Sequence, residues 1–316
     1  MRLRGVPGPA LVLALLCALA TAINPVFLSP RNLTDMLLAA APTLIAACGL
    51  MLVIASGEID ISIGSLMGLC AAVAGTLSSP DRLGLPPSVA VAATLALGLG
   101  VGLFNGVLVS LVRVPSIIVT LGMLSVLKGA NELLMAGKWI TRLPDGLRVW
   151  GTGSLLGVPV PIAVCAAVVA LAWILANRTA WGRRVFAVGS NADSARLAGI
   201  SVERTKLAAF GLAGLLVAVA TLVSVPRLSV VDSGVGVGFE LLVVTCVVVG
   251  GVSIRGGTGT ILGVVIGVLL LSSVRTVLIF LQLGESSLYW ERAIQGTLIL
   301  AAVMGDAAGR RKEARV

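Results

Sequence analysis

The sequence predicts an all-α, polytopic integral membrane protein whose helices form one bundle. Its 316 residues have a mean hydropathy of +1.08, and 58% of them are hydrophobic while only 12% are charged. Soluble proteins carry about 25% charged residues. In addition, long apolar segments recur along the whole chain, several of them near the ~20 residues that cross a bilayer as a helix.

These segments predict about ten membrane-spanning helices. They are Pro9–Ile23, Thr34–Ser56, Ile61–Ser79, Ser88–Val112, Pro115–Ala136, Pro159–Asn177, Lys206–Val225, Phe239–Ile254, Thr258–Leu281 and Trp290–Met304. The first segment also resembles a signal peptide, because Arg2 and Arg4 precede it and Ala-Leu-Ala-Thr-Ala ends it. Its cleavage stays open. We expect residues 1–316 to form a single transmembrane domain.

Basic residues favour the cytoplasmic side of membrane proteins and indicate the orientation. With the N-terminus inside, fourteen lysines and arginines lie on the cytoplasmic side, seven on the outer side, and Lys128 and Arg275 within spans. The cytoplasmic set is Arg2, Arg4, Arg113, Arg178, Arg183, Arg184, Arg196, Arg204, Lys206, Arg255, Arg310, Arg311, Lys312 and Arg315. We therefore predict a protein of the cytoplasmic (inner) membrane with both termini in the cytoplasm.

The composition also excludes several functions. There is no histidine, so histidine-dependent catalysis and histidine-ligated metals are excluded. The five cysteines are scattered through apolar segments without C-x-x-C spacing, which is typical of small packing residues. The net charge of +9 follows from the topology, so the sequence predicts no nucleic-acid partner. Glycines at four-residue spacing, as at Gly98, Gly102 and Gly106, predict close helix packing.

A polar hinge separates the second and third apolar segments. It reads Gly-Glu-Ile-Asp-Ile-Ser-Ile-Gly-Ser and places Asp60 and Ser62 at a membrane boundary. Ionisable groups in such positions are expensive and often mark a permeation path. A carboxylate and a hydroxyl can also cap the N–H groups of a helix start. Both a structural and a pathway role stay open for these residues.

Ionisable side chains within spans are few and supply the other pathway candidates. Lys128 and Glu132 are spaced i, i+4 and share a helix face with Asn131 close by. Arg275 lies inside the ninth segment, where burial against lipid would cost roughly 2.5–3.5 kcal/mol. We expect it to face the bundle interior, a polar cavity or a carboxylate such as Glu240. Three readings stay open: a buried structural pair, a lysine that snorkels to the outer surface, or a polar pathway in which Arg275 and Asn105 act as donors.

The longest polar stretch, residues 178–205, is predicted to be cytoplasmic and to contain a short helix. Asn191 suits the N-cap position, and Gly199 suits the C′ position that ends a helix. A helix of barely two turns does not persist unaided. We therefore expect something to dock on it, the alternative being a solvated basic loop that serves only topology.

Seven motifs follow one another along nearly the whole chain. They are Gly-x-x-Asp-x-Ser-x-Gly-Ser at Gly57–Ser65, Phe-Asn-Gly at Phe104–Gly106, Pro-Ser-Ile-Ile-Val-Thr-Leu-Gly-Met at Pro115–Met123, Thr-Ala-Trp-Gly-Arg at Thr179–Arg183, Ala-Val-Gly-Ser-Asn…Ala-Arg-Leu-Ala-Gly-Ile at Ala187–Ile200, Gly-Val-Gly-Phe-Glu at Gly236–Glu240 and Gly-Gly-Val-Ser-Ile-Arg-Gly-Gly-Thr-Gly at Gly250–Gly259. Together they resemble the ribose-type sugar permeases, the membrane subunits of binding-protein-dependent ABC importers. Gly137–Pro144 is most similar to permeases for autoinducer-2 and rhamnose.

The resemblance implies a permease subunit that moves rhamnose, autoinducer-2 or a ribose-type sugar into the cytoplasm. It implies an extracytoplasmic sugar-binding protein, a second permease subunit (identical or homologous) and ABC-type ATPase subunits that bind ATP and magnesium. The chain has no G-x-x-x-x-G-K-[ST] motif, so we expect ATP hydrolysis on a partner, no cofactor on this chain and no enzymatic activity of its own.

Under this resemblance the short cytoplasmic helix is the predicted ATPase contact. Its residues are Asn191, Ala195 and Gly199, flanked by Arg183 and Arg184. The main alternative is an ion-coupled secondary carrier for a small polar solute, which is also a glycine-rich bundle but needs no docking helix or ATPase. A membrane-embedded enzyme would need convergent acid, base or nucleophile groups within the spans, and the sequence shows no such constellation. Departures from the family pattern at Glu58, Leu242 and Arg275 leave the transported sugar open.

Overall fold

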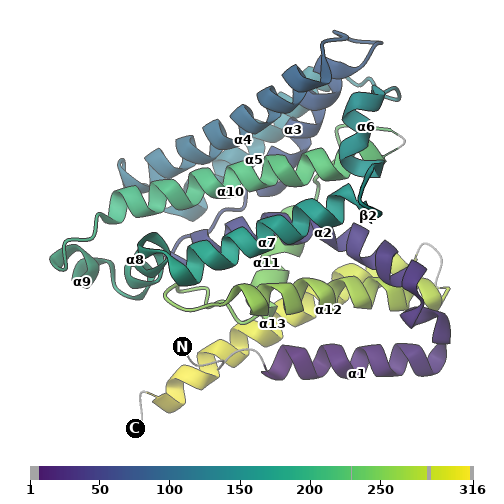
Figure 1. The fold of residues 1–316 in the computed structure, drawn as a ribbon. Helices are drawn as coiled ribbons and strands as arrows, with labels where there is room; N and C mark the ends of the chain where they lie inside the picture. The colour runs from purple at the N-terminus through teal and green to yellow at the C-terminus, as the bar shows by residue number, and fades with distance from the viewer. Residues whose placement is uncertain (1–6, 229, 283–285, 314–316) are drawn as a thin grey trace.

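A computed structural model describes residues 7–228, 230–282 and 286–313 of the chain. Throughout these residues the backbone is overwhelmingly α-helical, and the sheet they contain is a two-stranded hairpin with Ser154 opposite Pro159. This confirms the predicted all-α class. Figure 1 shows the long helices lying side by side as one bundle.

The elements have the following bounds in chain order. They are α1 (Pro7–Ile23), η1 (Pro25–Leu28), α2 (Pro30–Ala55), α3 (Ile63–Ser78), α4 (Pro87–Ser110), α5 (Ser116–Met135), α6 (Asp145–Thr152), β1 (Ser154–Leu155), β2 (Val158–Pro159), α7 (Val160–Arg178), α8 (Ala180–Ser190), α9 (Ala192–Leu197), α10 (Val202–Ser224), η2 (Val225–Arg227), α11 (Phe239–Val249), α12 (Ile261–Phe280) and α13 (Ser286–Glu313).

Six of the described helices are long and apolar enough to cross a membrane, namely α2, α4, α5, α7, α10 and α12. Three shorter apolar helices, α1, α3 and α11, accompany them. The last predicted span, Trp290–Met304, lies within α13. The polytopic character is therefore confirmed, whereas the count of about ten spans stays a prediction.

The eighth predicted span is shorter than expected. We predicted that it would continue to Ile254, but α11 ends at Val249. The reason is local, because Gly251 has a φ of +86°, which an α-helix cannot continue through. The chain then turns back through a glycine-rich loop before α12 begins at Ile261.

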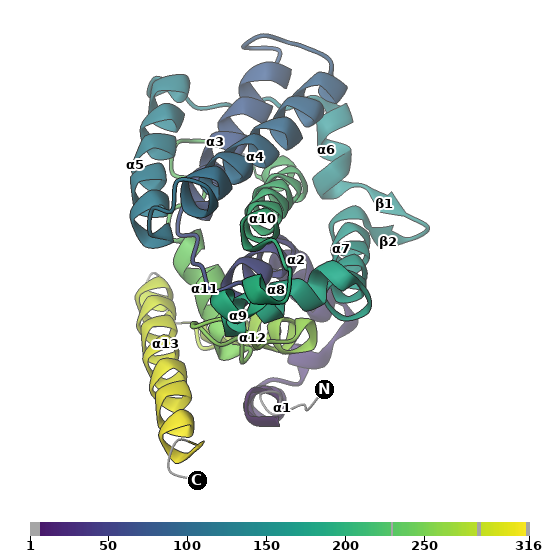
Figure 2. The same ribbon diagram turned by 90° about the vertical axis from the view of Figure 1, so that its left-hand side faces the viewer.

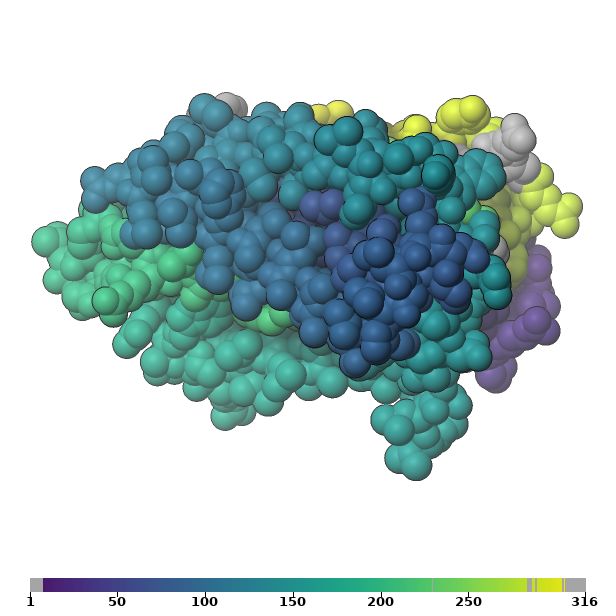
Figure 3. Space-filling model, turned by 90° about the horizontal axis from the view of Figure 1, so that it is seen from above, coloured from purple at the N-terminus to yellow at the C-terminus, as the bar shows by residue number. Residues whose placement is uncertain are grey.

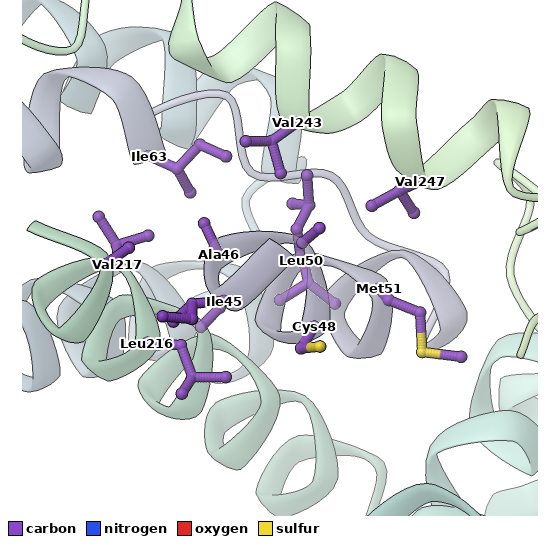
Figure 4. Packing of buried hydrophobic residues seen from close by; sticks show 14 of the residues in the cluster. Ile45, Ala46, Cys48, Leu50, Met51, Ile63, Leu216, Val217, Val243 and Val247 are labelled. Atoms are coloured by element: carbon purple, nitrogen blue, oxygen red, sulfur yellow. The ribbon is translucent and has the colours of Figure 1, made fainter. Parts of the chain in front are cut away.

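Helix α2 forms the centre of the core. Every residue from Ala40 to Ala55 is buried, as expected for a helix that is apolar on all faces. Figure 2 shows α2 surrounded by α7, α10, α11 and α12. In Figure 4, Ile45 of α2 lies beside Leu216 and Val217 of α10.

The glycines spaced four residues apart in the fourth span (the glycine ladder, Gly98, Gly102 and Gly106) pack against α10. This is the close helix packing that their spacing predicted. A Cβ atom on Gly98 would approach the carbonyl oxygen of Gly214 to 2.5 Å, which is closer than real side chains allow. At Gly102 it would overlap the carbonyl oxygen of Phe210. The two backbones can approach this closely only because these positions carry no side chain.

Different segments of the chain lie at the two ends of the bundle. The start of α1, the end of α13 and the α8–α9 segment all lie toward the left-hand end in Figure 1. Helix α6 and the β1–β2 hairpin lie at the opposite end. This arrangement agrees with a topology in which both termini and residues 178–205 share one side. Which end faces the cytoplasm stays a prediction from the basic residues.

Candidate functional site

A buried polar cluster lies where the chain passes from α2 to α3. Asp60 is only 3% exposed, and its Oδ1 accepts hydrogen bonds from the Ser62 backbone N–H (2.8 Å) and the Ser62 hydroxyl (2.6 Å). The Ser62 hydroxyl oxygen accepts a bond from Asn105 Nδ2 on α4 at 3.0 Å. Burial raises the pKa of the Asp60 carboxyl above its ordinary value, and hydrogen bonds from Ser62 and Asn105 oppose the rise.

The cluster caps α3 differently from our prediction. Ser62 occupies the N-cap position, but its hydroxyl makes no bond to the first turn and donates to Asp60 instead. Asp60 accepts the N–H of Ser62 itself. The capping role, one of the two readings that the sequence left open, is therefore not filled by Ser62, because its hydroxyl oxygen accepts from Asn105 and its proton is donated to Asp60.

The α2–α3 connection also contacts the first turns of α5, in addition to its contact with α4. The N–H of Ile59 donates to the Ser116 hydroxyl at 3.2 Å, and the Thr120 hydroxyl donates to the Ile59 carbonyl oxygen at 3.4 Å. Both backbone groups of Ile59 are thus paired with α5 side chains. The connection is consequently fixed between α4 and α5 and is not a free loop.

Glu58, in the same connection, forms an ion pair with Lys206 at the start of α10. Both side chains are mostly buried, so solvent screens this pair much less than the exposed Arg142–Asp81 pair. The contact joins the hinge to the helix that directly follows α9.

A small cavity of about 80 Å³ lies beside the first turn of α3. Ser65, Lys128, Asn131 and Glu240 contribute its polar lining, from α3, α5 and α11. Asn131 is 2% exposed and donates from Nδ2 to the Ser233 carbonyl oxygen at 3.1 Å. Its Oδ1 has no hydrogen-bond partner in the part of the chain that the structure describes, so it offers a buried acceptor.

Glycines on α3 allow the cavity wall to form. A Cβ atom on Gly64 would overlap the Glu240 carboxylate and would also meet the Gly236 carbonyl oxygen. One turn later, a Cβ on Gly68 would lie 2.6 Å from the Val235 carbonyl oxygen. The start of α3 therefore lies directly against the loop that leads into α11.

The remaining pathway candidates do not join this cavity. Glu132 is exposed on α5 and does not line it. Arg275 lies on α12, where its Nε is 3.8 Å from Glu291 Oε2 of α13. Arg275 therefore lies beside a carboxylate, which is one of the expected surroundings, but this carboxylate is Glu291 and not Glu240, which lies against Gly64. The structure also does not bring Arg275 and Asn105 together.

The predicted short helix is present as α9. The Asn191 side chain accepts a hydrogen bond from the Ser194 N–H at 2.8 Å, and Gly199 has a φ of +78° after the last turn. The N-cap and the C′ glycine are both as predicted. Arg183 and Arg184 are exposed on the adjacent helix α8.

Part of this short helix is supported by contacts within the chain. Ala195 is buried and packs with Val188 of α8 and Val202 of α10. The outward apolar side chain is Leu197, which is 91% exposed. Figure 3 shows the green α9–α10 region projecting beyond the blue α4 and α5. Sequence reasoning missed Leu197. A signal was present, because Leu197 is a large apolar residue in a short helix that is otherwise polar or small.

The end of α8 packs closely on the end of α2. A Cβ atom on Gly189 would overlap the Ala55 carbonyl oxygen, and the Gly257 N–H donates to that same oxygen at 2.9 Å. Sequence reasoning also missed the Lys206 contact, since nothing in the local pattern links it to Glu58.

These features define a multi-pass α-helical membrane protein with polar groups inside the bundle and a short capped helix, α9, at one end. A family profile described as "Branched-chain amino acid transport system / permease component" matches residues 32–303. The chain belongs to this family of permeases and is a transport component rather than an enzyme.

Individual relatives agree with this assignment. The autoinducer 2 import system permease protein of Enterobacter sp. (strain 638) is 36% identical over 305 residues, which cover 96% of this chain and 86% of the relative. The ribose import permease protein of Escherichia coli (strain K12) is 36% identical over 300 residues, covering 94% and 92%. No solved structure matches the chain.

Proposed function

We propose that this chain is the membrane-spanning permease subunit of an ABC importer that carries a sugar or sugar-like molecule into the cytoplasm. The observation that carries the proposal is the 36% identity to import permeases for ribose and autoinducer 2 over nearly the whole chain. Rhamnose, autoinducer 2 and ribose-type sugars are the candidate substrates.

The cavity beside α3 has a polar lining that suits the hydroxyl groups of such a substrate. Its lining offers the Asn131 Oδ1 acceptor, the Lys128 ammonium group, the Glu240 carboxylate and the Ser65 hydroxyl. Sugar hydroxyls can both donate and accept, so they can satisfy groups of each kind.

We propose that residues 178–205 form the coupling segment on which an ABC-type ATPase docks. In this proposal, Leu197 enters the ATPase surface, with Arg183 and Arg184 beside it, while Asn191, Ala195 and Gly199 shape and seat α9. ATP and magnesium bind to the ATPase, so this chain needs no cofactor of its own.

Two contacts connect the coupling segment to the substrate cavity. Lys206 of α10, directly after the coupling segment, reaches Glu58, and Gly189 of α8 packs on Ala55, both near the start of the α2–α3 connection. That connection leads through Asp60 and Ser62 into the turn of α3 that lines the cavity. Movement of α9 is thereby passed to α3.

The proposal includes a second permease subunit, identical or homologous, and an extracytoplasmic binding protein that delivers the sugar. Residues 1–316 act as one permease domain in the inner membrane, with both termini in the cytoplasm. An ion-coupled secondary carrier is less favoured, because the relatives are import permease proteins, one of them the permease protein of an import system.

Uptake of labelled ribose, rhamnose and autoinducer 2 into proteoliposomes tests the proposal. The full chain is reconstituted with its ATPase and binding protein, and uptake is compared with and without ATP. We expect uptake of one of these compounds only when all components and ATP are present. Equal uptake driven by an ion gradient without the ATPase would contradict the proposal and favour a secondary carrier.

A further inference from the structure

A second cavity, of about 310 Å³, lies between α2, α11, α12 and α13. It shares no lining residue with the cavity beside α3. Its walls combine apolar side chains, such as Met36, Leu271 and Phe280, with three charged ones, Asp35, Arg275 and Glu291. The proposed transport pathway uses none of these residues.

Arg275 and Asp35 are only loosely satisfied by the protein, whereas Glu291 accepts a hydrogen bond from Gln295 Nε2 at 3.4 Å. Arg275 approaches Glu291 to 3.8 Å, which is beyond hydrogen-bond distance, and its side chain remains 56% exposed. Asp35 is exposed and has no ion-pair partner among the residues that the structure describes. A guanidinium with several free N–H donors therefore faces a cavity that also contains two carboxylates.

The charges lie near the outer ends of their helices, from where long side chains such as that of Arg275 can reach the headgroup region. Asp35 is five residues from the start of α2 at Pro30, and Arg275 is five residues from the end of α12 at Phe280. At 1.5 Å per residue, each lies about 8 Å inside its helix end. In the predicted topology both helix ends are on the outer side, so the apolar walls face the acyl region of the outer leaflet.

We propose that this cavity binds one zwitterionic phospholipid with an ammonium headgroup, of the phosphatidylethanolamine class. Arg275 binds the phosphate, Asp35 and Glu291 accept hydrogen bonds from the ammonium group, and Met36, Leu271 and Phe280 contact an acyl chain. One positive and two negative side chains give the cavity a net charge of −1, which disfavours a purely anionic headgroup. Phosphatidylcholine has a cation but no N–H donors for the two carboxylates.

Native mass spectrometry of the purified full chain tests this site with three added lipids: phosphatidylethanolamine, phosphatidylcholine and phosphatidylglycerol. We expect the wild-type protein to retain one phosphatidylethanolamine in preference to the other two. Arg275→Gln should weaken retention of phosphatidylethanolamine about tenfold, since it removes a charge-assisted contact to phosphate. Arg142→Gln, which changes an exposed arginine outside the cavity, should leave retention unchanged.

A second variant keeps the test decisive if Arg275→Gln folds poorly. Asp35→Leu keeps a similar side-chain size and the arginine but has no acceptor. It should therefore still bind phospholipid but show a reduced preference for phosphatidylethanolamine over phosphatidylcholine. Gel filtration establishes that each variant is folded. Equal retention of all three lipids by the wild type, or unchanged preference in Asp35→Leu, would overturn the proposal.

Discussion

Glu58 in the α2–α3 connection and Lys206 in the first turns of α10 form a mostly buried ion pair. Lys206 follows closely on α9, which ends at Leu197 only a short turn before α10 begins at Val202. The pair therefore ties the hinge of the core helix to the segment proposed to contact the ATPase. Its loss should affect both stability and transport.

Removing one member of this pair leaves the other charge mostly buried without its partner. We expect Glu58→Gln and Lys206→Gln each to lower the free energy of unfolding by about 1–3 kcal/mol and to reduce ATP-driven uptake. The swapped double variant, Glu58→Lys with Lys206→Glu, should recover part of both losses. Thermal unfolding in detergent and uptake at equal membrane abundance measure them.

The exposed Arg142–Asp81 pair provides the control. Arg142→Gln should change the free energy of unfolding by no more than about 0.5 kcal/mol. If the swapped Glu58 and Lys206 variant is no better than the worse single variant, the ion pair does not carry the link between α10 and the hinge.

Leu197 should matter for coupling and not for folding. Because its side chain is 91% exposed, Leu197→Asp should leave the Tm unchanged within about a degree, in line with surface substitutions elsewhere. It should abolish ATP-driven uptake, since a charge would enter the proposed apolar contact. Leu156→Asp, at a 98% exposed position on the hairpin, is the matched control with normal uptake.

Ala195→Glu distinguishes the two faces of α9. Its side chain would enter the buried contact with Val188 and Val202, so this variant should lower the Tm as well as uptake. Normal uptake in Leu197→Asp at wild-type abundance would show that α9 is not the docking surface.

Local patterns predicted the helices of this protein well, and they predicted the tertiary contacts poorly. The α9 cap at Asn191 and the stop at Gly199 depend on neighbouring residues, so their chemistry is visible in the sequence. The glycine ladder on α4 was also visible, because its spacing alone places it on one face.

Contacts between distant segments left no comparable signal. Arg275 was expected near a carboxylate such as Glu240, but the packing of α13 against α12 places Glu291 beside it instead. Lys206 resembled any basic residue at the start of a span. Its partner Glu58 is 148 residues away in sequence, and only the burial of α2 brings the two together.

The close approach of α3 to the loop before α11 predicts a sensitivity at Gly64. Gly64→Ala would force a methyl group against the Glu240 carboxylate and the Gly236 carbonyl oxygen. We expect a loss of about 1–3 kcal/mol in the free energy of unfolding and a change in substrate preference, because Glu240 must move. Gly122→Ala on α5, where a Cβ meets nothing within 4 Å, is the control and should be neutral.

Equal Tm values for the Gly64→Ala and Gly122→Ala variants would contradict this packing. A lower Tm with unchanged substrate preference would instead show that Gly64 supports the packing of α3 but does not shape the substrate cavity. Measuring uptake of two competing sugars in the same proteoliposomes distinguishes these outcomes.

The sidedness of the bundle can be tested at its two most exposed leucines. In a cysteine-free background, Leu156→Cys should react with an impermeant maleimide added outside intact cells. Leu197→Cys should react only after the membrane is permeabilised. The expectation follows from the fourteen-to-seven distribution of basic residues and from the opposite positions of α9 and the hairpin in Figure 1. Labelling of Leu197→Cys from outside intact cells would show that the true topology is the inverse of the predicted one.

Asp60 tests whether the buried cluster is structural. Its Oδ1 accepts two hydrogen bonds from Ser62, so Asp60→Ala leaves a buried N–H and a buried hydroxyl without their acceptor. We expect a loss of about 1–3 kcal/mol in the free energy of unfolding. Asp60→Asn keeps a carbonyl oxygen at the same place and should lose about 1 kcal/mol less, because both donors can still be paired.

Asp81→Asn, at an exposed aspartate, should leave the Tm unchanged. If the Asp60 cluster also takes part in transport, Asp60→Asn will insert and unfold normally but alter the relative uptake of competing sugars. Wild-type stability and uptake in both Asp60 variants would contradict either role. In that case the burial of Asp60 would reflect only the packing of the hinge between α4 and α5.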